Sequence, residues 1–212
     1  MDKFTLPQFL RYLLIGFILI GVHYICFPKN AVNFYEELGK VGTPIFAFVA
    51  GSITFLFYRS TIYGIIILRI IDKIHPDNVR NILISRYDIP SWYKAEVFWQ
   101  VLQQAEFKEK LKNVDLGSAG THSLYMASIA GFVATIILFV KSGSDTKFWI
   151  VLGSSLILTI SAFISDYYIE TIETLLLKSI GTERIDEFAQ MMEFKKKTSE
   201  NGASADAKKA HR

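Results

Sequence analysis

The stretch FWIVLGSSLILTISAFISDYYIETIE, residues 148–173, decides the fold class. Its first 18 residues carry no charge, and an α-helix needs roughly 20 residues to cross ~30 Å of hydrocarbon. Three carboxylates then follow with no basic residue between them, at Asp166, Glu170 and Glu173. At spacings of four and three residues they share one face of a continuing helix. The stretch therefore predicts a membrane-spanning helix that extends into an acidic stripe.

Three further apolar segments of the 212-residue chain are about as long. A soluble helical bundle would need a polar stripe along each helix, and residues 136–140 and 149–164 show no such stripe. We therefore predict an all-α membrane protein with four transmembrane helices and a small helical cytoplasmic collar. The predicted spans are residues 9–27, 44–62, 122–140 and 148–166.

The basic residues indicate the orientation of these spans. Nine of the 23 Lys and Arg lie between Arg59 and Lys112, and eight follow Asp166, whereas the loops after the first and third spans hold two each. Segments rich in Lys and Arg stay in the cytoplasm. We expect a multi-pass protein of the cell inner (plasma) membrane, with both termini and the second loop cytoplasmic.

Four parts follow from this topology. Residues 1–71 hold the first pair of spans, whose second helix continues to Pro76, and residues 72–121 form a cytoplasmic helical loop that ends in the flexible link GSAGT. Residues 122–180 hold the second pair of spans with an extended fourth helix. Residues 181–212 form a helix to about residue 194 and a disordered tail.

Turn and capping residues predict where the cytoplasmic helices begin. Asp77 is expected to cap a short helix that ends at Ser85. Ser91 is expected to cap the next helix, and Thr182 the last.

Charged and polar side chains meet at the predicted inner boundary. Arg59 and Asp166 differ in depth by only ~4–5 Å, and His122 begins the third span beside them. An arginine near hydrocarbon needs a partner, so we expect Asp166 to satisfy Arg59. This layer fixes helix register, or provides an ion or proton path, or faces lipid head groups. The predicted inner-leaflet polar layer is Arg59, His122, Asp166, Glu170, Glu173 and Arg69, with Arg69 paired to Glu170 or Glu173.

Small residues four apart predict close helix packing, either within one chain or between subunits. The predicted packing residues are Ala47 and Gly51 in the second span, and Ser123, Ala127 and Gly131 in the third.

No motif for catalysis, nucleotide binding or metal ligation is present in the sequence. We expect no enzyme activity, no catalytic residue, no metal and no cofactor. The net charge of +3, with acidic and basic groups interspersed, gives no reason to expect nucleic acid.

We therefore expect a self-associating membrane protein that acts as a pore, channel-like or membrane-perturbing effector gated from the cytoplasm. Its partners would be membrane lipid, further copies of the chain, and a cytoplasmic protein or small ligand. A second reading is a non-conducting, membrane-docked binding or immunity-type module for a soluble partner. A third is an enzyme that acts on lipid through His122 and Asp166.

Overall fold

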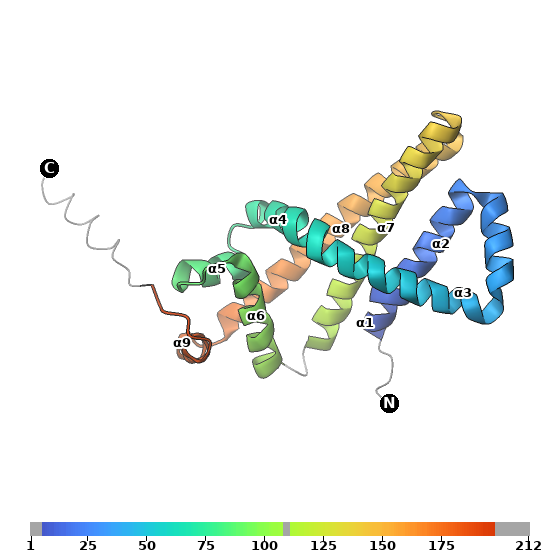
Figure 1. Cartoon of the computed structure of the whole chain (residues 1–212). Coiled ribbons are helices and arrows are strands. Elements are labelled where there is room, and N and C mark those ends of the chain that lie inside the picture. Colours follow the sequence, from blue (N-terminus) through green and yellow to red (C-terminus); the bar gives the residue numbers. More distant parts are fainter. Residues whose placement is uncertain (1–5, 108–110, 198–212) are drawn as a thin grey trace, which may run out of the picture. The chain divides into compact units, whose positions relative to one another are not determined.

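The computed structural model describes residues 6–107 and 111–197, which are helical for most of their length (Figure 1). The first half of the chain contains α1 (Leu6–Gln8), the π-helical turn η1 (Phe9–Leu14), α2 (Ile15–Cys26), α3 (Pro28–Tyr58), the π-helical segment η2 (Arg59–Ile67) and α4 (Leu68–Ile74). The second half contains α5 (Val79–Arg86), α6 (Trp92–Phe107), α7 (Leu111–Ser142), α8 (Thr146–Ser179) and α9 (Thr182–Met191).

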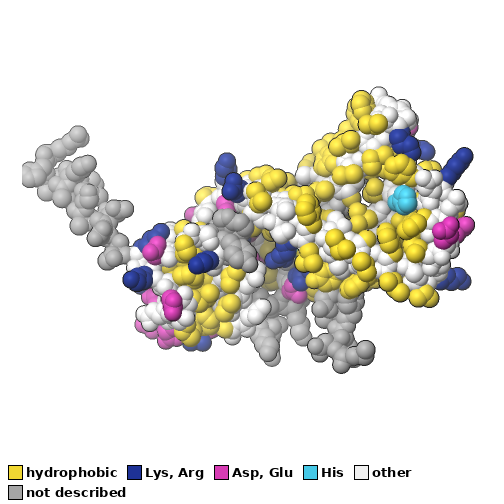
Figure 2. All heavy atoms as spheres, in the orientation of Figure 1, with side chains coloured by type: hydrophobic (Ala, Val, Ile, Leu, Met, Phe, Trp, Pro, Cys, Tyr) yellow, Lys and Arg dark blue, Asp and Glu magenta, His cyan; other side chains and the backbone are white. Residues whose placement is uncertain are grey.

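Four helical stretches of the described residues are long and apolar enough to cross a membrane. They are Phe9–Cys26 (η1 and α2), Pro28–Ile74 (α3, η2 and α4), Val114–Ser142 (within α7) and Thr146–Ser179 (α8). All-helical architecture with four such helices confirms the coarser part of the predicted fold class. Figure 2 shows hydrophobic side chains over the faces of α3 and of the α7–α8 hairpin. Each of the four stretches contains a long segment with few charged residues, which suits lipid better than water.

The chain divides into two units. The span unit comprises Met1–His75 and Lys110–Ile169, and the small unit comprises Pro76–Glu109 and Glu170–Arg212. The boundary falls within α8, so this one helix carries an apolar segment in the span unit and its last ten residues in the small unit.

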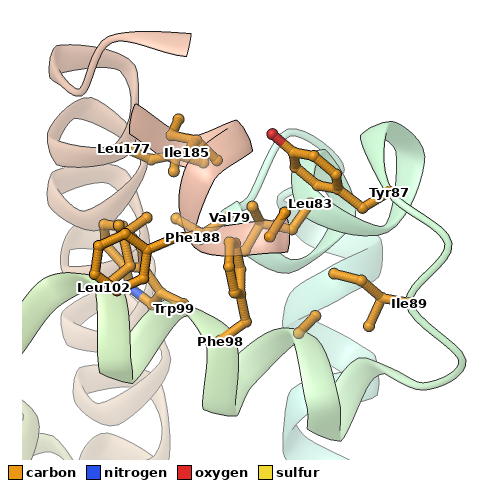
Figure 3. Close-up of a cluster of buried hydrophobic side chains, with 12 residues drawn as sticks. Val79, Leu83, Tyr87, Ile89, Phe98, Trp99, Leu102, Leu177, Ile185 and Phe188 are labelled. Carbon is orange, nitrogen blue, oxygen red and sulfur yellow. The ribbon is translucent and has the colours of Figure 1, made fainter. Parts of the chain in front are cut away.

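The small unit has a hydrophobic core of its own (Figure 3). Trp99, Phe98 and Leu102 of α6 are at most 1% exposed, and they pack with side chains of α5, α8 and α9. Burying an aromatic or leucine side chain contributes ~1.5–3 kcal/mol, so this cluster is what holds four short helical segments together.

The structure corrects the predicted loop between the first two spans. Residues 28–38 are helical, and α3 consists of two helices that meet at Gly39, where φ is 67°. Pro28 is favourable in the first helical turn, and Ala31 and Tyr35, four residues apart, are both buried. Glycine adopts this left-handed conformation without steric cost, so it can turn the chain.

A second correction concerns GSAGT, which was predicted to be a flexible link. These residues lie inside α7, where Ala119 is fully buried and Gly117 packs against Ile169 of α8. Thr121 also bonds the Ser165 hydroxyl. The small residues here allow two helices to approach closely.

The predicted helix starts were partly correct. Ser91 accepts from the backbone N–H of Lys94 at 3.3 Å, as expected of an N-cap. Asn78, one residue after the predicted Asp77, caps α5 by accepting from the N–H of Asn81. Gly181 precedes α9 in place of Thr182, and α9 ends at Met191. Residues 195–197 of the predicted disordered tail are ordered against α5, and residues 198–212 lie outside the described residues.

Candidate functional site

His122 lies at the centre of a buried polar cluster in the span unit. Its ring is 3% exposed, and Tyr58 Oη lies 3.2 Å from Nδ1. Arg59 Nη1 lies 3.4 Å from Nε2. A guanidinium can only donate, so Nε2 accepts and Nδ1 carries the proton that reaches Tyr58. The ring of Tyr63 packs edge-on against the imidazole at 4.4 Å between centroids.

Asp166 is held in the same unit by tyrosine hydroxyls. Tyr125 Oη donates to Oδ2 at 3.1 Å and Tyr63 Oη donates to Oδ1 at 3.5 Å. The carboxylate is 3% exposed. The expectation was that Arg59 would meet Asp166; the structure places His122 against Arg59 and tyrosines against Asp166.

The acidic stripe continues into the small unit, where Glu170 meets Arg80 of α5. Arg80 Nη2 lies 2.7 Å from Glu170 Oε1, and the two side chains are 3% and 4% exposed. Arg80 Nη1 also reaches Glu96 of α6 at 3.1 Å. One guanidinium thus joins α5, α6 and α8.

Glu173 and Thr174 make further polar contacts next to this cluster. Gln103 Nε2 of α6 donates to Glu173 Oε1 at 3.3 Å. Thr174 Oγ1 donates to the Asp77 carbonyl at 3.4 Å. The last turns of α8 are therefore tied by polar contacts to α6 and to the residues that precede α5.

The predicted pairing of Arg69 with Glu170 or Glu173 stays a prediction, because Arg69 belongs to the span unit and both carboxylates belong to the small unit. Arg69 is exposed on α4, whereas the arginine that binds Glu170 is Arg80, which the sequence reasoning missed. A signal was present: Arg80 stands beside Val79 and three residues before Leu83, and both of these are 1% exposed. An arginine on the buried face of a short helix needs a carboxylate partner.

The predicted packing residues of α3 lie against the first span. A Cβ added to Gly51 would lie 1.9 Å from the Tyr12 carbonyl oxygen, and one added to Gly16 would lie 1.8 Å from that of Ala47. The two helix backbones are therefore in direct contact at this crossing. Gly16 is a member of the crossing that the sequence reasoning did not single out.

The predicted packing residues of α7 also make contacts inside the chain. Ser123 Oγ donates to the Leu10 carbonyl at 3.0 Å. A Cβ on Gly131 would lie 2.1 Å from Ser155 Oγ of α8. Ala127, between them, is half-buried. Ser123 and Gly131 are therefore used in packing within one chain.

Among the described residues, no group of three or more His, Cys, Asp and Glu side chains could hold a metal ion. The described part of the small unit includes a surface pocket of about 490 Å³ beside the end of α8 and another of about 460 Å³ beside the end of α9.

Comparison with protein-family models, curated protein sequences and solved structures found no match to this chain.

Proposed function

We propose that the protein is a multi-pass membrane effector whose small unit receives a cytoplasmic partner or ligand and whose α8 helix carries that event to the spans. The observation that supports this most is the continuity of α8. Residues 146–169 belong to the span unit and residues 170–179 to the small unit.

The contacts of α8 in the small unit would couple movements of α5 and α6 to α8. Arg80 clamps Glu170 to α5 and Glu96, and Leu177 lies in the shared hydrophobic core. A partner that displaces α5 or α6 therefore acts on α8 itself. Because an α-helix is stiff over a few turns, rotation or tilt of its end would reach the apolar segment.

The proposed orientation puts the small unit in the cytoplasm, where the basic residues are concentrated. Cysteine labelling of intact cells tests this in a Cys26→Ser background. A cysteine at Asn33, in the segment after the first span, is expected to react with an impermeant thiol reagent, and one at Glu187 in α9 is expected to stay unlabelled. Labelling of the α9 position alone would reverse the orientation.

In the effector reading the spans self-associate and perturb the membrane. The most apolar 18-residue stretch of α8 supports this, since only 11% of it is buried within the chain, whereas 44% of the corresponding stretch of α7 is buried. Ile157, Ile160 and Ile164 are all more than half exposed. Such a face is available to lipid or to another copy.

A second candidate is a non-conducting, membrane-docked binding module. The internal use of the polar groups favours it, because His122 and Asp166 are each 3% exposed and hydrogen-bonded within one chain. A pore would have to draw its polar lining from other residues.

The two candidates differ in assembly and in conduction. The experiment is to measure the mass of the detergent-solubilised protein and the ion leakage of liposomes that contain wild type, Arg80→Gln or the exposed control Arg184→Gln. An oligomer whose leakage changes with Arg80→Gln but not with Arg184→Gln supports the effector. A monomer that never leaks overturns it in favour of the binding module.

A further inference from the structure

The chain reverses direction after α9 and lies along the segment that joins α5 to α6. Glu193 has φ of 60°, a left-handed conformation uncommon for a residue other than glycine. The N–H of Phe194 then donates to the Ala189 carbonyl at 2.8 Å. We call residues 194–197 the C-terminal strap and residues 86–88 the edge segment.

The strap and the edge segment pair as antiparallel extended chains. Tyr87 and Lys196 face each other in an antiparallel bridge. On either side of it, the N–H of Asp88 donates to the Lys195 carbonyl at 2.7 Å and the N–H of Lys197 donates to the Arg86 carbonyl at 3.0 Å. These bonds involve backbone atoms alone, so any extended peptide could make them.

Two side chains of the strap, at positions two residues apart, make specific contacts with the small unit. Phe194 packs edge-on against Phe98 of the core at 5.9 Å between ring centroids. Lys196 Nζ lies 2.7 Å from Asp186 Oδ2 of α9. Residues two apart in an extended chain point to the same side, so this edge selects an aromatic residue followed two positions later by a cation.

Tyr87 of the edge segment and Asp186 of α9 form part of the surface beneath the strap. Tyr87 is 1% exposed, and Figure 3 shows its hydroxyl turned toward α9. There it donates to Asp186 Oδ1 at 2.6 Å. Tyr87 thereby orients the carboxylate that receives Lys196. A pocket of about 460 Å³ lies between the strap and α9, which leaves room for a larger side chain.

We propose that the edge segment, together with Asp186, is a binding site for an extended peptide of the pattern aromatic-x-Lys. When no partner is bound, the chain's own strap occupies this site. This deepens the proposed function by naming the chemistry of a cytoplasmic partner, and it rests on that function only for what binding would trigger.

The attachment of the strap is of the kind that a partner can displace. Two backbone bonds to the edge segment, the contact of Phe194 with Phe98 and a bond from Lys197 Nζ to the Ile84 carbonyl hold it. One ion pair between a 58% exposed lysine and a 26% exposed aspartate adds to these contacts. Exposed ion pairs are weak. The strap competes chiefly because its short connection to α9 gives it a local concentration in the millimolar range.

The test uses the full-length protein in detergent and a fluorescein-labelled peptide with the sequence of residues 190–197, QMMEFKKK. The variant Phe194→Ala/Lys196→Glu weakens the strap and leaves the edge segment unchanged. Fluorescence anisotropy is expected to show at least about tenfold tighter peptide binding to this variant than to wild type, because the competing strap is released. A scrambled peptide is the control.

A charge exchange separates recognition from non-specific attraction. The double variant Phe194→Ala/Asp186→Lys, in which the strap's own Lys196 meets a like charge, is expected to lose the QMMEFKKK peptide and to bind QMMEFKEK, in which glutamate replaces the lysine equivalent to Lys196. The single change Lys196→Glu, at an exposed position, serves if the multiple variants fail to fold by circular dichroism.

Equal binding of the native and scrambled peptides would overturn the proposal, as would equal affinity of wild type and the strap-weakened variant. Neither outcome involves membrane leakage, so a failure here is distinguishable from a failure of the effector function.

Discussion

Asp166 and Glu170 lie one helical turn apart on α8 and are both 3% exposed, yet their partners differ in kind. Asp166, in the span unit, accepts hydrogen bonds from the neutral hydroxyls of Tyr125 and Tyr63. Glu170, in the small unit, pairs with the guanidinium of Arg80 at 2.7 Å. One acidic stripe thus serves two clusters.

The difference shows how each unit handles a buried charge. Taking an ion pair out of water is costly unless its geometry is good and its hydrogen bonds are complete. In the small unit the carboxylates Glu170 and Glu96 complete the contacts of Arg80. In the span unit, tyrosines supply a hydrogen bond from an otherwise apolar side chain.

The largest expected effect comes from breaking the charged cluster. Arg80→Leu leaves Glu170 buried without its cation, which we expect to destabilise the small unit by about 3–5 kcal/mol. The double variant Arg80→Leu/Glu170→Leu is expected to cost less than the sum of the single changes, since no buried charge is stranded. Thermal unfolding in detergent measures both.

Arg184→Leu is the matched control for Arg80→Leu. Arg184 also binds two carboxylates, those of Glu106 and Glu187, but it is 49% exposed. Its removal is expected to have much the smaller effect. Equal losses from the two variants would mean that burial does not distinguish the clusters.

The next largest effect tests the close crossing of the first two spans at Gly16 and Gly51. Gly51→Ala would put a methyl group 1.9 Å from the Tyr12 carbonyl oxygen, and we expect a loss of about 1–3 kcal/mol from the displaced helices. Gly21→Ala, with nothing within 4 Å of its added Cβ, is the control and is expected to be neutral. If both variants melt alike, the close crossing of the first two spans is wrong.

How far the sequence predicted these features depends on the range of the interaction. The spans and the shared face of Asp166, Glu170 and Glu173 follow from periodicity within one helix, and they could be read from the chain directly. Arg80 could not be assigned to Glu170, because they are 90 residues apart and only the fold brings α5 beside the end of α8.

Local signals also misled where a residue type has two uses. Glycine and serine in GSAGT are typical of linkers, and the same small residues suit close packing between α7 and α8. Composition alone cannot choose between these uses. The low apolar content of the tail from residue 195 onward predicted disorder, but pairing with the edge segment orders the backbone of residues 195–197.

A smaller effect is expected from the hydroxyl donors of the span unit. Tyr125→Phe removes the hydrogen bond to Asp166 at 3.1 Å and is expected to cost about 1 kcal/mol, the usual net contribution of one intramolecular hydrogen bond. Tyr168→Phe, on the 63% exposed ring of α8, is the control and is expected to change little. A null result for Tyr125 would assign the support of Asp166 to its other contacts.

The smallest expected effect on stability comes from Asp186. Its carboxylate is partly exposed, unlike those of Asp166 and Glu170. Its hydrogen bond from Lys196, and then that from Tyr87, hold the pKa of Asp186 below the ordinary value, with Arg86 adding a further attraction. Because the folded pKa is the lower one, this contribution to stability is present above the unfolded pKa of about 4 and is lost as pH falls through the folded value.

The measurement is the difference in unfolding free energy between wild type and Asp186→Asn from pH 7 down to pH 2.5. We expect wild type to be more stable by less than about 1 kcal/mol at pH 7, since the ion pair with Lys196 is exposed. The difference should shrink below pH 4, because a protonated Asp186 resembles asparagine in charge. A difference that stays constant over this range would show that Asp186 holds the strap by packing or by a neutral hydrogen bond. In that case a peptide that binds the edge segment would need no cation two positions after its aromatic residue.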